Sequence, residues 1–208
     1  MNDSLGTPQH GGAVPGHARR GPGRPRSEQA RRAVLKASME LLQQGGLRAM
    51  TTDQIASRSG VSKATIYKWW PNKYAVAAEA FLTQMFAESP DSDTGSAYED
   101  FRIAVRGMVR FYASPSGRVF AQLVAESQSD PVVAAELRDH LIGSRRALVR
   151  AIWARGVDRG ELRADVDPEV AIDLLFGPAI YRLIAGHAPL DEAAADEIVR
   201  TAMRGLAG

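Results

Sequence analysis

Residues 51–70, TTDQIASRSGVSKATIYKWW, carry the pattern that most limits how this chain can fold. Thr51 and Gln54 have the spacing of a capping box, in which two side chains satisfy the first free amides of a helix. We therefore expect a short helix to start directly after Thr51. Gly60 follows where a tight turn requires positive φ, and Ser62 suits the N-cap of a second helix. The pattern predicts two helices that cross steeply over a short turn.

The second helix of this pair has a short, polar and positively charged outward face. With Ile66 buried as its anchor, the residues that point outward are Ser62, Lys63, Thr65, Lys68 and Trp69. Such a face suits a helix in the DNA major groove, with its first residues at base edges and others on phosphates. The alternative is an ordinary helical hairpin whose polar face contacts only water.

The chain after this motif favours the DNA-binding interpretation. The stretch TTDQIASRSGVSKATIYKWWPNKYAVAAEA resembles the N-terminal domain of TetR/AcrR-type repressors, and the likeness covers about residues 28–88. By position, the resemblance implies that Thr52, Tyr67 and Lys73 contact phosphates. It also implies that the residues facing the groove are Ser62, Lys63, Ala64, Thr65, Lys68 and Trp69.

The motif departs from the family pattern at two positions. Members usually have phenylalanine where this chain has Trp70, and many have glycine where it has Ala64. We expect Trp70 to fill the same core position. The methyl group of Ala64 could contact a thymine methyl group.

Composition excludes several classes of protein. The chain has 208 residues, 45% of them hydrophobic, so it can bury a substantial core. Cysteine is absent, which excludes disulfides, thiolate metal sites and a cysteine nucleophile and agrees with a reducing cytoplasm, where we expect the protein. No apolar run approaches the ~20 residues that cross a bilayer. We therefore expect no membrane contact, no metal and no cofactor.

Charge is unevenly distributed along the chain. The net charge is +2, yet residues 1–74 contain 12 Lys and Arg against 4 Asp and Glu, a balance of +8, so residues 75–208 carry −6. The basic part is the one expected to bind nucleic acid. Neutralisation of phosphates by this part predicts a steep dependence of binding on salt.

Residues 1–26 form a basic arm rich in Gly and Pro, which we expect to be disordered. Its segment 19–26, RRGPGRPR, resembles the Gly-Arg-Pro core of AT-hook segments, in which an extended backbone lets arginines enter an A·T-rich minor groove. Arg24 is the candidate for this contact. The alternative is a solvated tail that adds only general electrostatic attraction.

Helix start signals recur through the chain. Ser27 suits the N-cap of a first helix that stops at Gly45-Gly46, and Asn72 suits that of a fourth helix reaching about Glu88. A helix over residues 97–113 follows. Three later starts pair a capping side chain with a proline in the first turn, at Ser114-Pro115, Asp130-Pro131 and Asp167-Pro168.

No alternation typical of strands appears, so we predict an all-α fold of about nine helices. A helix-turn-helix DNA-binding domain is expected over residues 27–88, after the arm, with its motif at 51–70. A helical bundle for effector binding and dimerisation is expected over residues 89–208. Within it, the segment from Pro131 toward Gly160 should form one long helix.

The segment after Pro168 is apolar nearly all round, and it contains a Gly177-Pro178 pair that we expect to kink the helix. A helix without a polar face must be buried on more than one side. Pairing helices 168–186 and 192–206 with their copies would give a two-fold symmetric homodimer, which the resemblance also implies. The partner of such a dimer would be double-stranded DNA with an inverted-repeat operator.

The resemblance further implies an effector, a small molecule that enters a cavity among the C-terminal helices and tilts the fourth helix. Candidate residues for lining this cavity are Met85, Met108, Phe111, Tyr112, Phe120, Leu123, Trp153 and Tyr181. For each residue taken singly, filling the core is the simpler interpretation. His140 and Arg182 could orient an anionic or polar effector, although surface positions are the simpler interpretation for both.

Two other classes of function are alternatives to a regulator. An enzyme would need a paired acid and base, a nucleophile with its base, or a metal cluster, and four scattered histidines without a phosphate-binding glycine loop argue against it. An architectural DNA-binding protein with little sequence preference is the main alternative. The pattern does not separate repressor from activator, and the resemblance favours repression.

Overall fold

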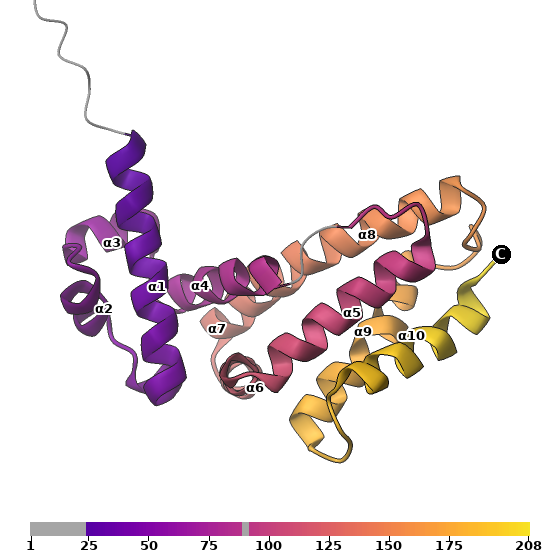
Figure 1. Cartoon of the computed structure of the whole chain (residues 1–208). Helices are drawn as coiled ribbons and strands as arrows, with labels where there is room; N and C mark the ends of the chain where they lie inside the picture. The colour runs from indigo at the N-terminus through magenta and orange to yellow at the C-terminus, as the bar shows by residue number, and fades with distance from the viewer. Residues whose placement is uncertain (1–23, 89–91) are drawn as a thin grey trace, which may run out of the picture.

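The computed structural model describes residues 24–88 and 92–208 and confirms the all-α fold class (Figure 1). The N-terminal helices are α1 (Arg24–Ala49), α2 (Thr52–Ser59), α3 (Lys63–Trp69) and α4 (Lys73–Glu88). The C-terminal bundle contains α5 (Ala97–Ala113), α6 (Pro115–Ser127), α7 (Pro131–Ala135), the π-helix η1 (Glu136–Ile142), α8 (Gly143–Asp158), α9 (Pro168–Ala185) and α10 (Glu192–Leu206). Over the described residues, extended pairing is limited to one isolated bridge between Leu162 and Ala207.

The first helix starts earlier than the sequence pattern predicts. Helix α1 begins at Arg24, so Ser27 lies inside the helix and is not its N-cap. The reason is that Pro25 occupies the first turn, where a residue without an amide hydrogen is tolerated. The basic arm up to residue 23 and the side chain of Arg24 lie outside the described residues.

The predicted stop of the first helix is present as a kink. Gly46 has a φ of 73°, which interrupts the helical geometry, but the chain then completes another turn to Ala49. A β-carbon at Gly46 would lie 2.4 Å from Oε1 of Gln122 on α6. The positive φ favours glycine at this position, and a larger residue would also displace the side chain of Gln122.

The predicted caps of the later helices are confirmed. The Asn72 side chain accepts a hydrogen bond from the amide of Ala75 at 2.8 Å, which fixes the start of α4. Ser114, Asp130 and Asp167 cap α6, α7 and α9, each with a proline in the first turn. These side chains replace the partners that the first amides of a helix lack.

The prediction of one long helix after Pro131 is confirmed, because residues 131–158 are helical without interruption. The segment divides into α7, η1 and α8, and the amide of Gly143 bonds to the carbonyl of Arg138 across the wide turn of the π-helix. Leu137 and Leu141 in this turn are both buried, at 8% and 2% exposure. Apolar spacing in the sequence does not reveal such a one-residue insertion.

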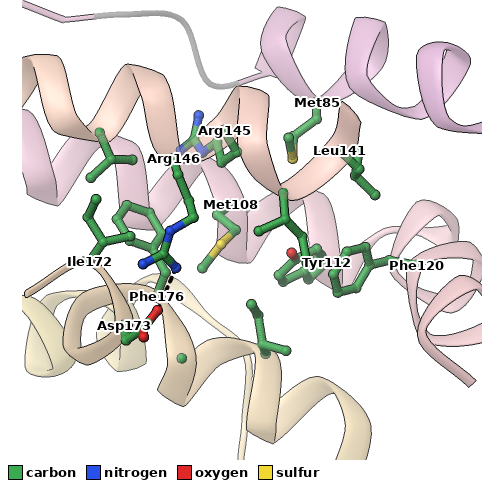
Figure 2. A pocket seen from close by; sticks show the side chains of 14 residues that line it. Met85, Met108, Tyr112, Phe120, Leu141, Arg145, Arg146, Ile172, Asp173 and Phe176 are labelled. Carbon is green, nitrogen blue, oxygen red and sulfur yellow. Dashed lines mark hydrogen bonds and ion pairs between the residues drawn. The ribbon is translucent and has the colours of Figure 1, made fainter. Parts of the chain in front are cut away.

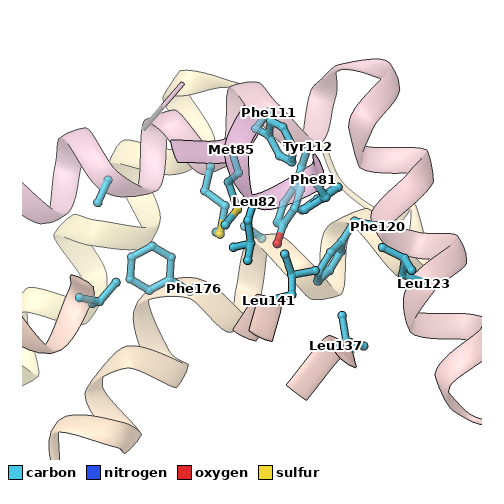
Figure 3. Close-up of a cluster of buried hydrophobic side chains, with 14 of the residues drawn as sticks. Phe81, Leu82, Met85, Phe111, Tyr112, Phe120, Leu123, Leu137, Leu141 and Phe176 are labelled. Carbon is cyan, nitrogen blue, oxygen red and sulfur yellow. The ribbon is translucent and has the colours of Figure 1, made fainter. Parts of the chain in front are cut away.

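Helix α4 enters the bundle and supplies part of its core (Figure 3). The ring of Phe81 lies edge-on to Phe111 at 4.7 Å and stacks on Phe120 at 5.6 Å, measured between centroids. Phe120 in turn stacks on Tyr112 at 5.0 Å. One aromatic cluster therefore joins α4 to α5 and α6.

Helix α9 is continuous from Pro168 to Ala185, with Pro178 inside it. One of its faces packs on the bundle, whereas the other exposes large apolar side chains. The exposed residues of this face are Val170, Leu174, Tyr181 and Ile184. Despite this apolar character, no helix within residues 24–88 and 92–208 has both the length and the hydropathy needed to span a membrane.

The contact between the end of α5 and the start of α6 generates a stability prediction. A β-carbon at Gly117 would lie 1.9 Å from the carbonyl oxygen of Tyr112, so Gly117→Ala must displace one of the two helices. We expect a loss of about 3 kcal/mol in the free energy of unfolding, measured by urea denaturation. Arg118→Ala, an exposed neighbour, should change it by less than ~0.5 kcal/mol. Equal stability of the two variants would contradict this packing.

Candidate nucleic-acid interface and internal pocket

The start of α2 is fixed by both halves of the predicted capping box. Oγ1 of Thr51 accepts a hydrogen bond from the amide of Gln54 at 3.2 Å, and Oε1 of Gln54 accepts one from the amide of Thr51 at 3.0 Å. Gly60 ends α2 with a φ of 70°, and its amide bonds to the carbonyl of Ala56. The turn toward α3 is thus determined by local hydrogen bonds and by a glycine in the left-handed region.

Helix α3 starts at the predicted cap. Oγ of Ser62 accepts a hydrogen bond from the amide of Thr65 at 3.3 Å, and the hydroxyls of Ser62 and Thr65 lie 2.9 Å apart. On the inner side, Ile55 of α2 and Ile66 of α3 are almost fully buried. This burial turns the opposite face of α3 toward solvent.

The outer face of α3 exposes Lys63, Ala64, Tyr67 and Lys68. Nζ of Lys63 lies 2.8 Å from Oδ1 of Asp53, and this hydrogen bond raises the pKa of the lysine. Both partners are largely exposed, so their attraction contributes little to stability and a phosphate could replace the carboxylate. The hydroxyl of Tyr67 donates to Oγ1 of Thr52 at 3.4 Å, which places these two side chains together at the edge of this face.

Lys73 lies at the start of α4 and contacts the end of α1. Its Nζ donates to the carbonyl oxygens of Leu47 at 3.1 Å and Met50 at 3.3 Å. A lysine has three donors, and a positive charge is favourable at the carbonyl end of a helix. In this structure Lys73 therefore joins α1 to α4, and the phosphate contact stays a prediction.

The two tryptophans have different environments. Trp70 is buried, and its Nε1 donates to Oε2 of Glu79 at 2.7 Å. Glu79 also accepts two hydrogen bonds from Arg31, each 2.9 Å long, so one carboxylate joins α1, α4 and the end of α3. Trp69 is only half-exposed, because it packs edge-on against Trp70 at 5.5 Å and against the core.

A cavity of about 90 Å³ lies among α4, α5, α6, η1, α8 and α9 (Figure 2). Its apolar wall includes Met85, Met108, Tyr112, Phe120, Leu141, Ile142, Val149, Ile172, Phe176, Gly177 and Ile180. Its charged residues are Arg145, Arg146 and Asp173. Burial raises the pKa of the Tyr112 phenol above its usual range, so this hydroxyl stays neutral at physiological pH.

The two arginines of the pocket have different partners. Arg146 pairs with acidic groups of α9, since its Nε lies 2.6 Å from Oε2 of Glu169 and its Nη1 lies 2.5 Å from Oδ1 of Asp173. Arg145 donates from Nη2 to the carbonyl oxygen of Ala104 at 3.2 Å, and its guanidinium lies 5.6 Å from the ring centroid of Phe176. Burial lowers the pKa of Arg145.

Both halves of the chain match models of known protein families. A family model described as bacterial regulatory proteins of the tetR family matches residues 34–80, and one described as a tetracyclin repressor-like C-terminal domain matches residues 91–202. The chain belongs to the TetR family. It is therefore a DNA-binding transcriptional regulator and not an enzyme.

Individual TetR-family proteins are similar to this protein over most of its chain. The helix-turn-helix transcriptional regulator YdeS of Bacillus subtilis is 39% identical over 88% of this chain and 93% of its own length. The DNA-binding transcriptional repressor TetR of Mycobacteroides abscessus is 31% identical over 81% of this chain and 88% of its own. The crystal structure of the TetR-family regulator SCO0332 superimposes with a TM-score of 0.77, at 32% identity, over 85% of this chain and 98% of its own.

The structure separates the eight candidate effector residues into three groups. Four of them, on three helices, line the cavity: Met85, Met108, Tyr112 and Phe120. Phe111, Leu123 and Trp153 are buried but belong to the packed core and not to the cavity wall. Tyr181 is 65% exposed on the outer face of α9, where it lies beside His187. A helix that is apolar all round does not indicate which of its faces is covered within one chain, and this explains the misplacement of Tyr181.

The polar candidates from the sequence also lie outside the cavity. The side chain of His140 is 67% exposed, and Arg182 donates to the carbonyl of Pro189. The arginine that does line the cavity, Arg145, was missed because a charged residue on a helix gives no local signal that it faces a cavity. The contacts of Arg31 and Glu79 with Trp70 were not predicted either. The sequence did contain an indication of them, because Trp70 replaces the usual phenylalanine and its indole N–H needs a hydrogen-bond acceptor.

The different environments of two lysines predict different effects of the same substitution. Lys73→Met should lower the free energy of unfolding by about 1.5–3 kcal/mol, because two carbonyls lose a charged donor. Lys68→Met removes the same charge from an exposed position and should change it by less than ~0.5 kcal/mol. Chemical denaturation of both variants tests this difference. Equal losses of stability would show that Lys73 does not join α1 to α4.

Proposed function

We propose that this TetR-family regulator is a repressor that binds an inverted-repeat operator as a homodimer and leaves it when a small molecule enters the pocket. The observation that carries this proposal is the position of α4. Its first turn contacts the helix-turn-helix unit through Lys73, and its last turns reach the wall of the pocket at Met85. A change in pocket volume would therefore act directly on the helix that supports the DNA-binding unit.

In the proposed complex, α3 lies in the major groove. Its exposed N-terminal turn supplies base contacts, and the cations on the same helix supply phosphate contacts. The groove-facing residues are Ser62, Lys63, Ala64, Thr65, Lys68 and Trp69. Thr52, Tyr67 and Lys73 contact the phosphates on either side. Arg24 enters the neighbouring minor groove from the first turn of α1 and not from the extended backbone that the AT-hook resemblance predicts.

The homodimer is supported by the outer face of α9. Val170, Leu174 and Ile184 are each more than half exposed, although they are large and apolar. A groove between α9 and α10, lined by Leu174 and Ile198 among others, continues this surface. A two-fold axis that pairs α9 and α10 with their copies would cover both features.

A second contact connects the pocket to the DNA-binding unit through α6. Phe120 faces the pocket, and two residues later Oε1 of Gln122 accepts a hydrogen bond from the amide of Leu47 at 3.4 Å. Arg48 pairs with Glu126 at 3.2 Å. Since α4 and α6 both contact the pocket and α1, a ligand can bias two arrangements of the DNA-binding unit, provided that it binds one of them more tightly.

Repression is supported by the relative from Mycobacteroides abscessus, which is named as a DNA-binding transcriptional repressor. The architectural alternative differs in its specificity. A regulator should prefer its operator over random DNA by about 10³-fold or more, whereas an architectural protein should discriminate little.

Selection from a randomised duplex pool at near-physiological salt tests the operator, and two substitutions test the interface. We expect an inverted repeat among the recovered sequences. Lys63→Ala should weaken binding to all DNA because a cation is lost, whereas Thr65→Ala should change which bases are preferred. A pool without an enriched motif would favour the architectural alternative. Equal effects of both variants on random DNA would contradict the proposed roles of the two residues.

Substitution on α9 tests the dimer. Leu174→Glu should shift the protein toward monomer in sedimentation equilibrium, because it places a charge in the proposed apolar interface. Val132→Glu is a matched control, since Val132 on α7 is 48% exposed and Leu174 is 51% exposed. If both variants sediment with the same dimer mass as the wild type, the dimer interface lies elsewhere.

A further inference from the structure

The hydroxyl of Tyr112 is a polar group without a partner in the wall of the pocket. Tyr112 lies on α5 and is only 6% exposed, yet it lines the cavity. Within residues 24–88 and 92–208, its hydroxyl has no hydrogen-bond partner. Buried polar groups in folded proteins are nearly always hydrogen-bonded, so this exception requires an explanation.

Neither packing nor a water molecule explains this hydroxyl well. Phe120 stacks on the ring of Tyr112 at 5.0 Å, and Met108 lies one helical turn before it on the same face of α5. A phenylalanine would make the same ring contacts without the cost of a buried hydroxyl. A buried water needs about two to four polar partners, whereas these two neighbours are apolar. An atom of a ligand in the cavity is therefore the partner that fits best.

Burial also determines the protonation of this group. It raises the pKa of the Tyr112 phenol, so the hydroxyl keeps its proton at neutral pH. A neutral phenol can both donate and accept a hydrogen bond. The group therefore suits one hydroxyl or carbonyl oxygen on a ligand.

The ionised groups of the wall already have partners within the chain. Arg146 pairs with both Glu169 and Asp173. Arg145 donates to the carbonyl oxygen of Ala104 and takes part in a further interaction. A charged ligand would lose its water without gaining an ionised group that lacks a partner, and this loss is costly in an apolar cavity. The pocket therefore favours a ligand without net charge.

The rest of the wall favours an aromatic body of limited size. Its apolar surface includes the ring of Phe176 and the thioethers of Met85 and Met108, and thioethers pack favourably against aromatic rings (Figure 2). The cavity of about 90 Å³ is smaller than the ~150 Å³ cavity that accommodates benzene in an engineered protein, so a single ring already requires movement of the wall. The flexible side chains of Met85 and Met108 can provide this movement.

We propose that the pocket binds a neutral monocyclic aromatic compound whose hydroxyl or carbonyl oxygen forms a hydrogen bond with Tyr112. This inference rests on the proposed ligand response and specifies its chemistry. Because Met85 belongs to α4, its displacement by the ring would act on the helix that contacts the DNA-binding unit through Lys73.

Calorimetric titration of the full-length protein tests the preference for a neutral ligand. The oxygen-bearing neutral probes are phenol, benzyl alcohol and acetophenone, and the charged probes are benzoate and benzylamine, all at neutral pH and constant ionic strength. We expect at least one neutral probe to bind, and both charged probes to bind more weakly than the best neutral probe by about 10-fold or more. Absence of binding by all three neutral probes at about 10 mM, or a charged probe that binds as tightly as the best neutral one, would overturn the inference.

Removal of the hydroxyl tests its role. Tyr112→Phe should weaken binding of the best oxygen-bearing neutral probe by about 3-fold or more, but it should not weaken binding of toluene, which has no oxygen. Tyr98→Phe is the matched control, because it removes an exposed hydroxyl from the same helix and should leave both affinities unchanged. An unchanged affinity of Tyr112→Phe for the oxygen-bearing probe, or an equal loss for toluene, would overturn the inference.

The stability of the same variant is a readout that does not depend on the choice of probe. Since the hydroxyl has no partner in the described part of the chain, Tyr112→Phe should unfold at the same temperature as the wild type or at a higher one. A marked loss of thermal stability would mean that the hydroxyl has a partner within the protein, and the inference would fail.

Parallel measurement of operator binding separates this inference from the proposed function. If an oxygen-bearing neutral probe binds through Tyr112 and operator affinity is unchanged, the ligand chemistry stands and the ligand-controlled release fails. If toluene releases the operator as effectively as the best oxygen-bearing probe, the release stands and the inference of a hydrogen bond to Tyr112 fails.

Discussion

Packing of α4 against both halves of the molecule is the constraint on which the other geometry depends. At its start, Lys73 and Glu79 connect it to α1 and to the end of α3. In its middle, Phe81 is the centre of the aromatic cluster of the bundle, and Met85 reaches the pocket. Because a close-packed interior transmits strain, the proposed function requires that a displacement of α4 at the pocket reach its other end at the DNA-binding unit.

Charged side chains have two separate roles in this structure. The two hydrogen bonds from Arg31 to Glu79, together with the one from the indole of Trp70 to Glu79, hold three helices in fixed positions. Lys63, in contrast, pairs with Asp53 in water, where the pair contributes little and either partner can be exchanged. The groups that hold Trp70 in place are thus distinct from Lys63, whose exchange of a carboxylate for a phosphate would leave those buried contacts unchanged.

Local signals predicted most of the fold, and long-range contacts account for the differences. The capping box at Thr51 and the caps at Ser62 and Asn72 were correct, because each depends only on residues within one helical turn. The π-helix was not predictable, since apolar spacing in the sequence does not distinguish a π-helical turn from an α-helical one. The lining position of Arg145 and the exposure of Tyr181 depend on which helix faces the other helices cover, so the apolar candidates for the pocket were only partly placed and its cation was not foreseen.

The distance between the two DNA-binding units of the proposed homodimer tests most directly whether α4 couples them to the pocket. The native chain has no cysteine, so Ser57→Cys on the exposed side of α2 accepts one spin label per protomer. Pulsed electron resonance would compare this protein with the same protein carrying Met108→Trp, which fills the cavity without a ligand. We expect the label-to-label distance distribution of the folded Met108→Trp dimer to shift by several ångströms and its operator affinity to fall. Superimposable distributions and equal affinity would contradict the coupling.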